Sequence, residues 1–214
     1  MYLVQELFEI RTGMSEIQRP RRADAERNRE AILDAAMRCL SVNPRASMAA
    51  IAAEAGVGRV TLYGHFSSRG EVIEAAFARA MTRAEASLSG LALDGEPFDA
   101  LERLVLASWR IVDESRLVLQ AAEEELGLDT VKRHHAESME RVRGLVRRGR
   151  RTGAFRKDLP ADWLVTCYYA VLHGAAEEVR SGRLAQAGAD QVVWRTIDAL
   201  FRPPAKRAAR GVDR

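Results

Sequence analysis

Residues Ser47 to Arg69 read SMAAIAAEAGVGRVTLYGHFSSR, and this stretch decides the fold class of the chain. Its pattern predicts two short helices joined by a tight turn around Gly56, a residue that tolerates the left-handed backbone such turns need. The hydroxyl of Ser47 can cap the first helix, and Ala52 is small enough for a close helix crossing. These features meet the steric requirements of a helix-turn-helix. On spacing alone an ordinary helical hairpin stays open as the alternative, because glycine-containing helix turns are common.

Helical periodicity continues on both sides of this stretch. Ile32, Ala36 and Leu40 recur at helical spacing and predict a helix over 24–42. This helix is expected to end before Pro44, because proline disfavours helical backbone in its predecessor. The sequence has no run of alternating β-branched residues bounded by turns, so the chain is predicted to be all-α. Further helices are predicted over 58–65, 67–88, 98–114, 116–126, 129–151, 160–181 and 189–201.

Breaker residues divide the predicted helices into two domains. Gly90, Gly95 and Pro97 mark a linker where the sequence turns acidic. The predicted architecture is an N-terminal three-helix helix-turn-helix domain followed by a C-terminal helical bundle. It comprises an N-terminal extension and basic arm over 1–23, a helix-turn-helix domain with a linking fourth helix over 24–88, the bundle over 89–202 and a basic flexible tail over 203–214.

Composition excludes several protein classes. With 214 residues, 47% of them hydrophobic and 29% charged, the chain can bury a core without disulfides or metals. The longest uncharged apolar stretch, 163–176, is shorter than the roughly 20 residues of a membrane helix, and residues 1–18 lack the basic start of a secretory signal. Cys39 and Cys167 have no metal-ligand or disulfide-framework spacing. We therefore expect a cytoplasmic protein with no cofactor and no metal.

Charge is segregated along the chain. Residues 19–69 hold nine arginines against five acidic residues, whereas residues 94–129 hold ten acidic residues against three arginines. The basic section could contact a polyanion, although a basic balance alone does not establish nucleic-acid binding.

The segment from about Arg29 to Phe77 resembles the N-terminal DNA-binding region of the TetR/AcrR family of bacterial transcriptional repressors. The remainder, over about 98–201, resembles the family only in being helical and of similar length. The resemblance implies a DNA-binding repressor, not an enzyme, that acts as a homodimer on a double-stranded DNA operator and is released by a small-molecule effector. The residues that carry it are Ile32, Ala35, Ala36, Ile51, Ala52, Ala55, Gly56, Val57, Thr61, Leu62, Tyr63, His65, Phe66, Ser68, Arg69 and Val72.

The second helix of the helix-turn-helix supplies the predicted base contacts. Its N-terminal half would enter the major groove, where each base pair presents a distinct set of donors and acceptors. Arg59 can address guanine bidentately, and the Val60 or Thr61 methyls can touch a thymine methyl. Gly64 departs from the family pattern, which usually has a larger side chain there, so readout would depend more on Arg59 or on DNA shape.

Four further residues are predicted to contact the DNA backbone. The resemblance assigns phosphate contacts to Tyr63 and His65, whose hydroxyl and imidazole are suitable donors. Ser47 and Arg69 each combine a side-chain donor with the exposed amides of a helix N-terminus.

The C-terminal helices are predicted to serve assembly and ligand binding. The helices over 160–181 and 189–201 carry broad apolar faces, which by the resemblance would form a four-helix dimer interface; ordinary core packing is the alternative. A ligand pocket is predicted among the middle helices, although aromatic residues also serve in helical cores. Its candidate lining residues are Trp109, Gln120, Glu123, His135, Met139, Tyr168 and Tyr169.

Two other function classes stay open at this point. A helical enzyme would use Glu123 or His135 as an acid or base, but no convergent catalytic constellation can be assembled around them. Alternatively, a helix-turn-helix protein could carry a protein-interaction module or a ligand-free scaffold as its C-terminal domain. A filled C-terminal core would favour that reading.

Overall fold

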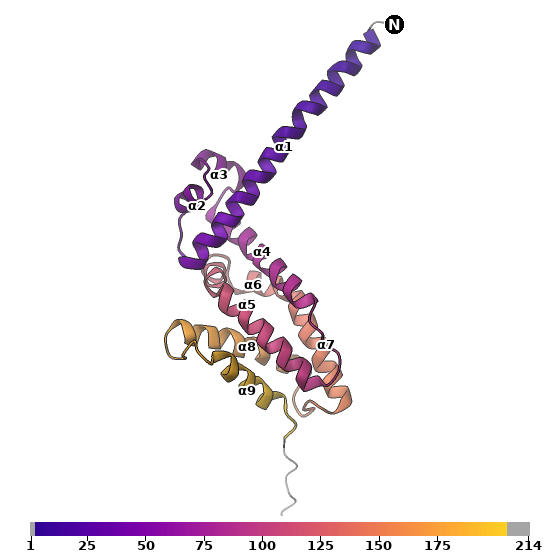
Figure 1. Cartoon of the computed structure of the whole chain (residues 1–214), viewed down its shortest axis with the longest axis vertical. Helices are drawn as coiled ribbons and strands as arrows, with labels where there is room; N and C mark the ends of the chain where they lie inside the picture. The colour runs from indigo at the N-terminus through magenta and orange to yellow at the C-terminus, as the bar shows by residue number, and fades with distance from the viewer. Residues whose placement is uncertain (1–2, 205–214) are drawn as a thin grey trace, which may run out of the picture. The chain divides into compact units, whose positions relative to one another are not determined.

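The computed structural model describes residues 3–204, and it describes side chains from residue 23 onward except those of residues 128, 132, 136 and 137. This part of the chain contains helices and no strand, so the all-α prediction is confirmed (Figure 1). The helices are α1 (Leu3–Val42), α2 (Met48–Glu54), α3 (Arg59–His65), α4 (Arg69–Ser89), α5 (Pro97–Leu126), α6 (Leu128–His134), α7 (Ala136–Thr152), α8 (Ala161–Arg180) and α9 (Ala189–Phe201).

Two compact units make up the described chain. Unit 1 contains the described residues up to Arg79 together with Leu117–Gly127, and unit 2 contains Ala80–Arg116 and the described residues from Leu128 onward. The sequence-based division at residue 88 differs from this one, because α4 and α5 each contribute residues to both units. A contact between segments far apart in the sequence leaves no local signal, which is why the boundary could not be seen there.

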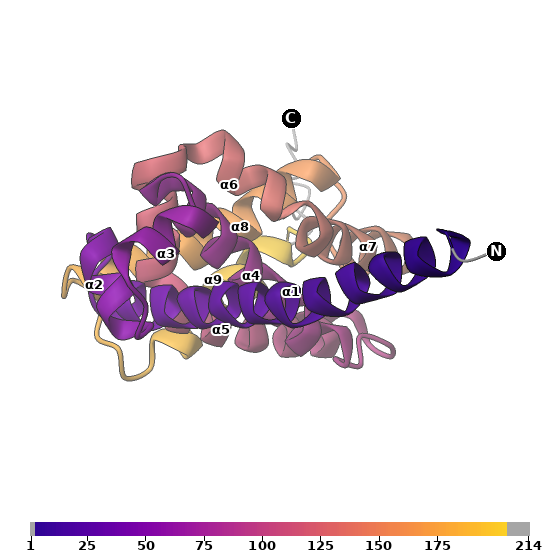
Figure 2. The ribbon, with the colours of Figure 1, turned by 90° about the horizontal axis from the view of Figure 1, so that it is seen from above.

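Unit 1 is built around the second half of α1. Among the described side chains of α1, Ile32 is the first buried one, and α2 packs against α1 and against α3 (Figures 1 and 2). Ile51 of α2, Leu62 of α3 and Ile73 of α4 are fully buried with it. These side chains remove apolar area from water and so hold the short helices, which would be marginal in isolation, in a fixed arrangement.

α1 begins at Leu3, so residues 3–23 are helical and extend the helix that was predicted over 24–42. Residues 3–12 contain leucine, glutamine, glutamate and arginine, which favour helix, and glycine is absent from them. The side chains of the basic arm, residues 19–22, lie outside the described side chains, and the tail lies outside the described residues from 205 onward.

Two predicted helix boundaries in the C-terminal half are wrong. Residues 98–126 form one helix, α5, because no glycine or proline interrupts it near residue 115. The helix predicted over 129–151 is divided at His135 into α6 and α7. There the imidazole Nδ1 of His135 lies 2.9 Å from the Val131 carbonyl, so the side chain engages the acceptor that a continuing helix would offer to the His135 amide.

Unit 2 has its core where α7, α8 and α9 pack in succession (Figures 1 and 2). Phe155, which follows α7, is fully buried and makes edge contacts with Phe98 and Phe201, at ring-centroid distances of 5.0 and 5.3 Å. A Cβ atom at Gly149 would overlap the Phe155 ring. The absence of a side chain at Gly149 therefore allows the aromatic cluster to close.

None of the described helices is both long and apolar enough to cross a membrane.

Candidate DNA-binding surface and ligand cavity

α3 presents a distinct exposed face. Val60 is 88% exposed and Tyr63 52% exposed, whereas Leu62 between them is fully buried and fixes the helix to the core. Arg59 and Gly64 are also exposed. The four predicted base contacts thus include three exposed residues, Thr61 being half-buried. A side chain at Gly64 would meet nothing within 4 Å, so this part of the helix surface is open.

Local backbone interactions set the angle between α2 and α3. The Ser47 hydroxyl accepts a hydrogen bond from the Ala50 amide at 3.2 Å, which caps α2 as predicted. Gly56 has φ +68°, and the Val57 amide donates to the Ala52 carbonyl at 3.0 Å. Gly58 caps α3 without a side-chain hydrogen bond. The turn is therefore formed by one glycine in the left-handed region, and the Ser47 hydroxyl proton can still be donated outward.

Two of the predicted phosphate contacts are available at this surface. Tyr63 is exposed, and His65, at the end of α3, is half-buried. Phe66 directly after it is buried, with the Arg29 guanidinium 5.1 Å from its ring centroid. This cation–π contact anchors the end of α3 to α1.

Arg69 has an internal role that the sequence did not reveal. Its Nε donates to the Ala46 carbonyl at 3.1 Å and its Nη2 to the Pro44 carbonyl at 2.7 Å, while its Nη1 pairs with Glu125. The guanidinium thus ties the start of α4 to the turn before α2 and to the last turn of α5. The guanidinium of Arg69 thus has a structural role in unit 1, and its predicted phosphate contact stays a prediction.

Arg45 is a candidate that sequence reasoning missed. Its side chain is 80% exposed and lies two residues before the cap Ser47, with the Glu124 carboxylate 3.5 Å from its Nε. Such an exposed ion pair contributes little to stability, so the cation can exchange partners easily. Its place next to the α2 cap was the available signal.

Unit 2 contains a small cavity of about 40 Å³ with a mainly apolar wall. Helices α4, α5, α7 and α8 supply its lining, and His135 adds a ring where α6 meets α7. The volume is well below the roughly 300 Å³ of a small ligand pocket. The lining residues are Met81, Ala84, Leu88, Leu104, Ser108, Ile111, Val112, His135, Ser138, Arg141, Val142, Tyr169, Leu172 and His173.

A polar cluster closes one side of this cavity. Arg141 of α7 donates to the Glu85 carboxylate of α4 at 2.6 Å, and the Ser138 hydroxyl donates to the same carboxylate. Both charged side chains are about four-fifths buried, at 20% and 17% exposure. Charge-assisted bonds with so little access to water are stronger than surface pairs, so they hold α4 against α7.

Three rings, those of His135, Tyr169 and His173, lie together in the wall of the cavity. The His173 ring stacks near Tyr169 at 6.3 Å between centroids and meets His135 edge-on at 5.6 Å. Burial, together with the neighbouring His135, lowers the pKa of His173 to about 4. Burial also lowers the pKa of His135. Both imidazoles are therefore neutral near pH 7.

The predicted ligand residues separate into two groups. His135 and Tyr169 line the cavity, whereas the others do not. Trp109 and Tyr168 are buried in the core of unit 2, and Met139 packs against that core. The Tyr168 hydroxyl lies 2.9 Å from the Ser108 hydroxyl and 3.2 Å from the Leu104 carbonyl, so its polar group is satisfied internally.

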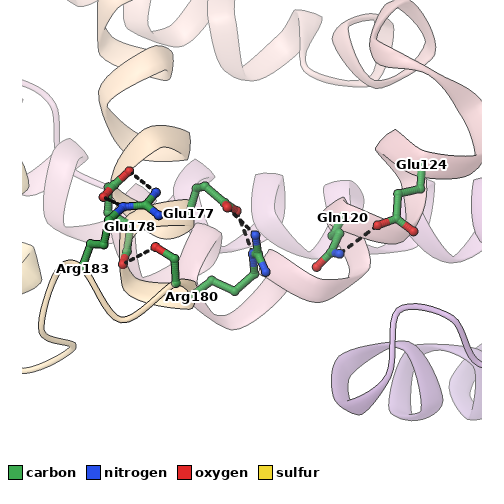
Figure 3. Close-up of polar contacts among 7 residues, drawn as sticks. Gln120, Glu124, Glu177, Glu178, Arg180 and Arg183 are labelled. Atoms are coloured by element: carbon green, nitrogen blue, oxygen red, sulfur yellow. Dashed lines mark hydrogen bonds and ion pairs between the residues drawn. The ribbon is translucent and has the colours of Figure 1, made fainter.

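The two remaining candidates belong to unit 1. Gln120 donates to Glu124 at 2.8 Å (Figure 3), and Glu123 is exposed on the same stretch of α5. Figure 3 also shows Glu177 paired with Arg180, with a contact of 2.7 Å to its Nε. Glu177 thus has an arginine partner one turn after His173. No group of three His, Cys, Asp or Glu side chains suited to a metal ion is found among the described side chains.

Comparisons with known proteins bear on the surface around α3. Residues 32–76 match the model of the bacterial regulatory proteins of the tetR family. An HTH-type transcriptional repressor, LfrR of Mycolicibacterium smegmatis, is 40% identical over 88 residues, which is 39% of this chain and 44% of LfrR. Over this segment the chain is therefore similar to TetR-family regulators. The matched residues run from the buried part of α1 through α2 and α3 into α4.

Solved structures of transcriptional regulators share the fold over about four-fifths of this chain. LfrR from Mycobacterium smegmatis in complex with proflavine superposes with a TM-score of 0.63 at 23% identity, covering 80% of this chain and 94% of LfrR. FadR from Bacillus subtilis in complex with stearoyl-CoA gives 0.66 at 14% identity, covering 79% and 97%. At these identities the likeness concerns the fold. The aligned part of the LfrR sequence is less than half of that protein.

Proposed function

We propose that this protein is a TetR-family transcriptional repressor that binds a palindromic DNA operator and is released from it by a small molecule. The observation that carries the proposal is the exposed face of α3 in a capped helix-turn-helix. An α-helix fits the major groove, where its exposed side chains can reach base edges. The role puts the protein in the cytoplasm, with DNA as its partner and no catalytic step.

The residues of α3 divide by their chemistry into those suited to base contacts and those suited to phosphate contacts. Arg59 offers a planar fork of donors that matches guanine, and Val60 offers methyl groups to thymine. Tyr63 and His65 offer single donors suited to phosphate oxygens, which fix register without reading sequence. Ser47 and Arg45, on the turn before α2, extend the phosphate-contacting side of this surface.

We infer a homodimer from α8 and α9. Trp163 and Val192 are 53% and 47% exposed, which is unusual for large apolar side chains, while Leu164 and Val193 beside them are buried in the core. The core therefore uses only part of the predicted apolar faces. Joining the exposed part to its copy in a second chain would remove it from water and give a two-fold assembly suited to a palindrome.

The release step is argued from α4. Its residues Met81, Ala84 and Leu88 line the cavity of unit 2, and the same helix begins at Arg69 in unit 1. A ligand can promote release only if it binds the released conformation more tightly than the DNA-bound one. Linkage then requires operator DNA to weaken ligand binding by the same factor, typically about 5- to 150-fold.

The small cavity supports a second candidate function. With about 40 Å³ the core of unit 2 is nearly filled, which favours a DNA-binding protein whose unit 2 is a scaffold or a protein-interaction module. The two functions share the operator and differ in the effector.

One experiment tests both. Selection from random duplexes should enrich a two-fold symmetric sequence, and a screen for compounds that release the protein from that duplex should then find active ones. Recovery of no preferred sequence contradicts the repressor. A preferred sequence with no releasing compound favours the scaffold.

A further inference from the structure

We propose that the cavity of unit 2 binds a neutral, mainly apolar molecule that carries a single hydroxyl group, and that His173 holds this hydroxyl through Nδ1. The inference names the ligand class of the repressor proposed above and rests on that function for its consequence at DNA. Ligand binding can be measured without DNA, so the ligand site and the repressor function can be contradicted independently.

The first argument is an unsatisfied polar atom in the wall. Nδ1 of His173 is buried and has no hydrogen-bond partner among the described residues. Buried polar atoms are nearly always paired, and leaving one unpaired is unfavourable. A neutral imidazole presents one donor and one acceptor. A ligand hydroxyl can act as either, so it pairs with Nδ1 in both tautomers.

Charge balance argues for a neutral ligand. Among the described side chains of the wall, Arg141 is the only charged one, and its partner Glu85 neutralises it at 2.6 Å. The histidines His135 and His173 are neutral for the reasons given above. A charged ligand would enter this mainly apolar space without a counter-charge, unless it broke the Glu85–Arg141 pair.

The shape of the wall argues for a ring. The imidazole of His173 and the phenol of Tyr169 lie nearly parallel, at an interplanar angle of 20°, while His135 meets His173 at 81°. Edge and face positions of this kind suit an aromatic ligand. A ring needs more than about 40 Å³, so the wall must widen. Met81, which is unbranched and lines the cavity, is suited to that adjustment.

Three simple probes of similar size separate the alternatives: phenol, toluene and benzoate. Calorimetric titration of the full chain should show phenol binding about tenfold more tightly than toluene, because only phenol satisfies Nδ1. Benzoate should bind more weakly than both. In His173→Phe, phenol should lose this advantage while toluene keeps its affinity. His134→Phe makes the same change at a histidine outside the cavity wall and should keep the tenfold preference.

Contrary results in the binding of the three probes overturn the proposal. Equal binding of phenol and toluene to the wild-type protein contradicts a role for the ligand hydroxyl. Tighter binding of benzoate than of phenol contradicts a neutral ligand. If His173→Phe does not fold, as judged by near-ultraviolet circular dichroism, His173→Gln is measured instead. Its amide can pair with the ligand hydroxyl, so this variant should keep most of the preference for phenol over toluene. Phenol binding that leaves operator affinity unchanged contradicts the regulatory function alone and leaves the site standing.

Discussion

The guanidinium of Arg69, the first residue of α4, pairs with the carboxylate of Glu125 in the last turn of α5, 56 residues further along the chain. The same guanidinium binds two carbonyls of the turn before α2. One side chain therefore joins three segments of unit 1, and this contact decides how the helix-turn-helix is held.

Removing Glu125 should loosen unit 1. Glu125→Gln should lower the free energy of unfolding by about 1 kcal/mol, because the pair is about one-third exposed and its loss is partly compensated by water. Arg69→Ala should lower the free energy of unfolding by about 2 to 3 kcal/mol, because the partly buried carbonyls of Pro44 and Ala46 also lose their hydrogen-bond donor. Glu124→Gln is the matched control, with an exposed pair and little effect expected. Urea unfolding followed by far-ultraviolet circular dichroism measures all three.

Arg59 and Tyr63 should differ in how they affect DNA binding. Arg59→Ala should weaken operator binding by about 1 to 3 kcal/mol, concentrated at one base pair of each half-site. Tyr63→Phe should weaken binding to all sequences alike and make the salt dependence shallower. Binding to matched and singly mismatched duplexes at several salt concentrations distinguishes them. An equal loss on both duplexes for Arg59→Ala contradicts its role as a base reader.

Acid should destabilise unit 2 through His173. Burial lowers its pKa from 6.5 to about 4, so between these values the unfolded chain holds a proton that the folded chain does not. The free energy of unfolding should therefore fall as pH decreases from 6.5 to 4 and level off below, by roughly 3 kcal/mol for the full shift. Tryptophan fluorescence in urea follows this. His173→Phe should flatten the profile, and His134→Phe should not.

Two glycines of α7 should respond oppositely to alanine. Gly149→Ala forces a methyl group into the Phe155 ring and should lower the free energy of unfolding by about 1 to 3 kcal/mol. Gly144→Ala meets nothing within 4 Å and should raise it by up to about 1 kcal/mol through helix propensity. Adding Phe155→Leu to Gly149→Ala should recover part of the loss. Independent, additive effects in that double variant would show that the ring is not the cause.

The exposed apolar residues of α8 and α9 should control assembly. Trp163→Glu combined with Val192→Glu should convert a dimer into a monomer at micromolar concentration, because a charge would then be buried in the interface. Val60→Glu places the same change on a more exposed position, in α3, and should leave the assembly intact. Sedimentation velocity reports the outcome. A wild-type monomer would contradict the inferred dimer directly.

Local signals made the helix-turn-helix predictable. The Ser47 cap, the Gly56 turn and the buried Leu62 each depend on neighbours within a few residues, so their sequence pattern is sufficient. The bounds of α9, Ala189–Phe201, were predicted for the same reason. The family resemblance covered the helix-turn-helix as well.

Contacts across the fold could not be predicted in the same way. Periodicity shows that a helix has an apolar face, but it does not show which helix covers that face. Tyr168 illustrates this, because an aromatic residue in the middle of α8 suits a pocket or a core, and only its hydroxyl contact to Leu104 decides for the core. Glu85 and Arg141, likewise 56 positions apart, were not recognised as partners.

The assignment of Leu117–Gly127 to unit 1 has a consequence for anyone who wishes to exchange DNA-binding modules between regulators. A chimera that transplants only the first 79 residues would leave Arg69 and Arg45 facing a foreign α5, without Glu125 and Glu124 as partners. A working graft needs two pieces of sequence, and the second lies between the two segments that form unit 2. Modularity in this protein is thus a property of contacts in space and not of position along the gene.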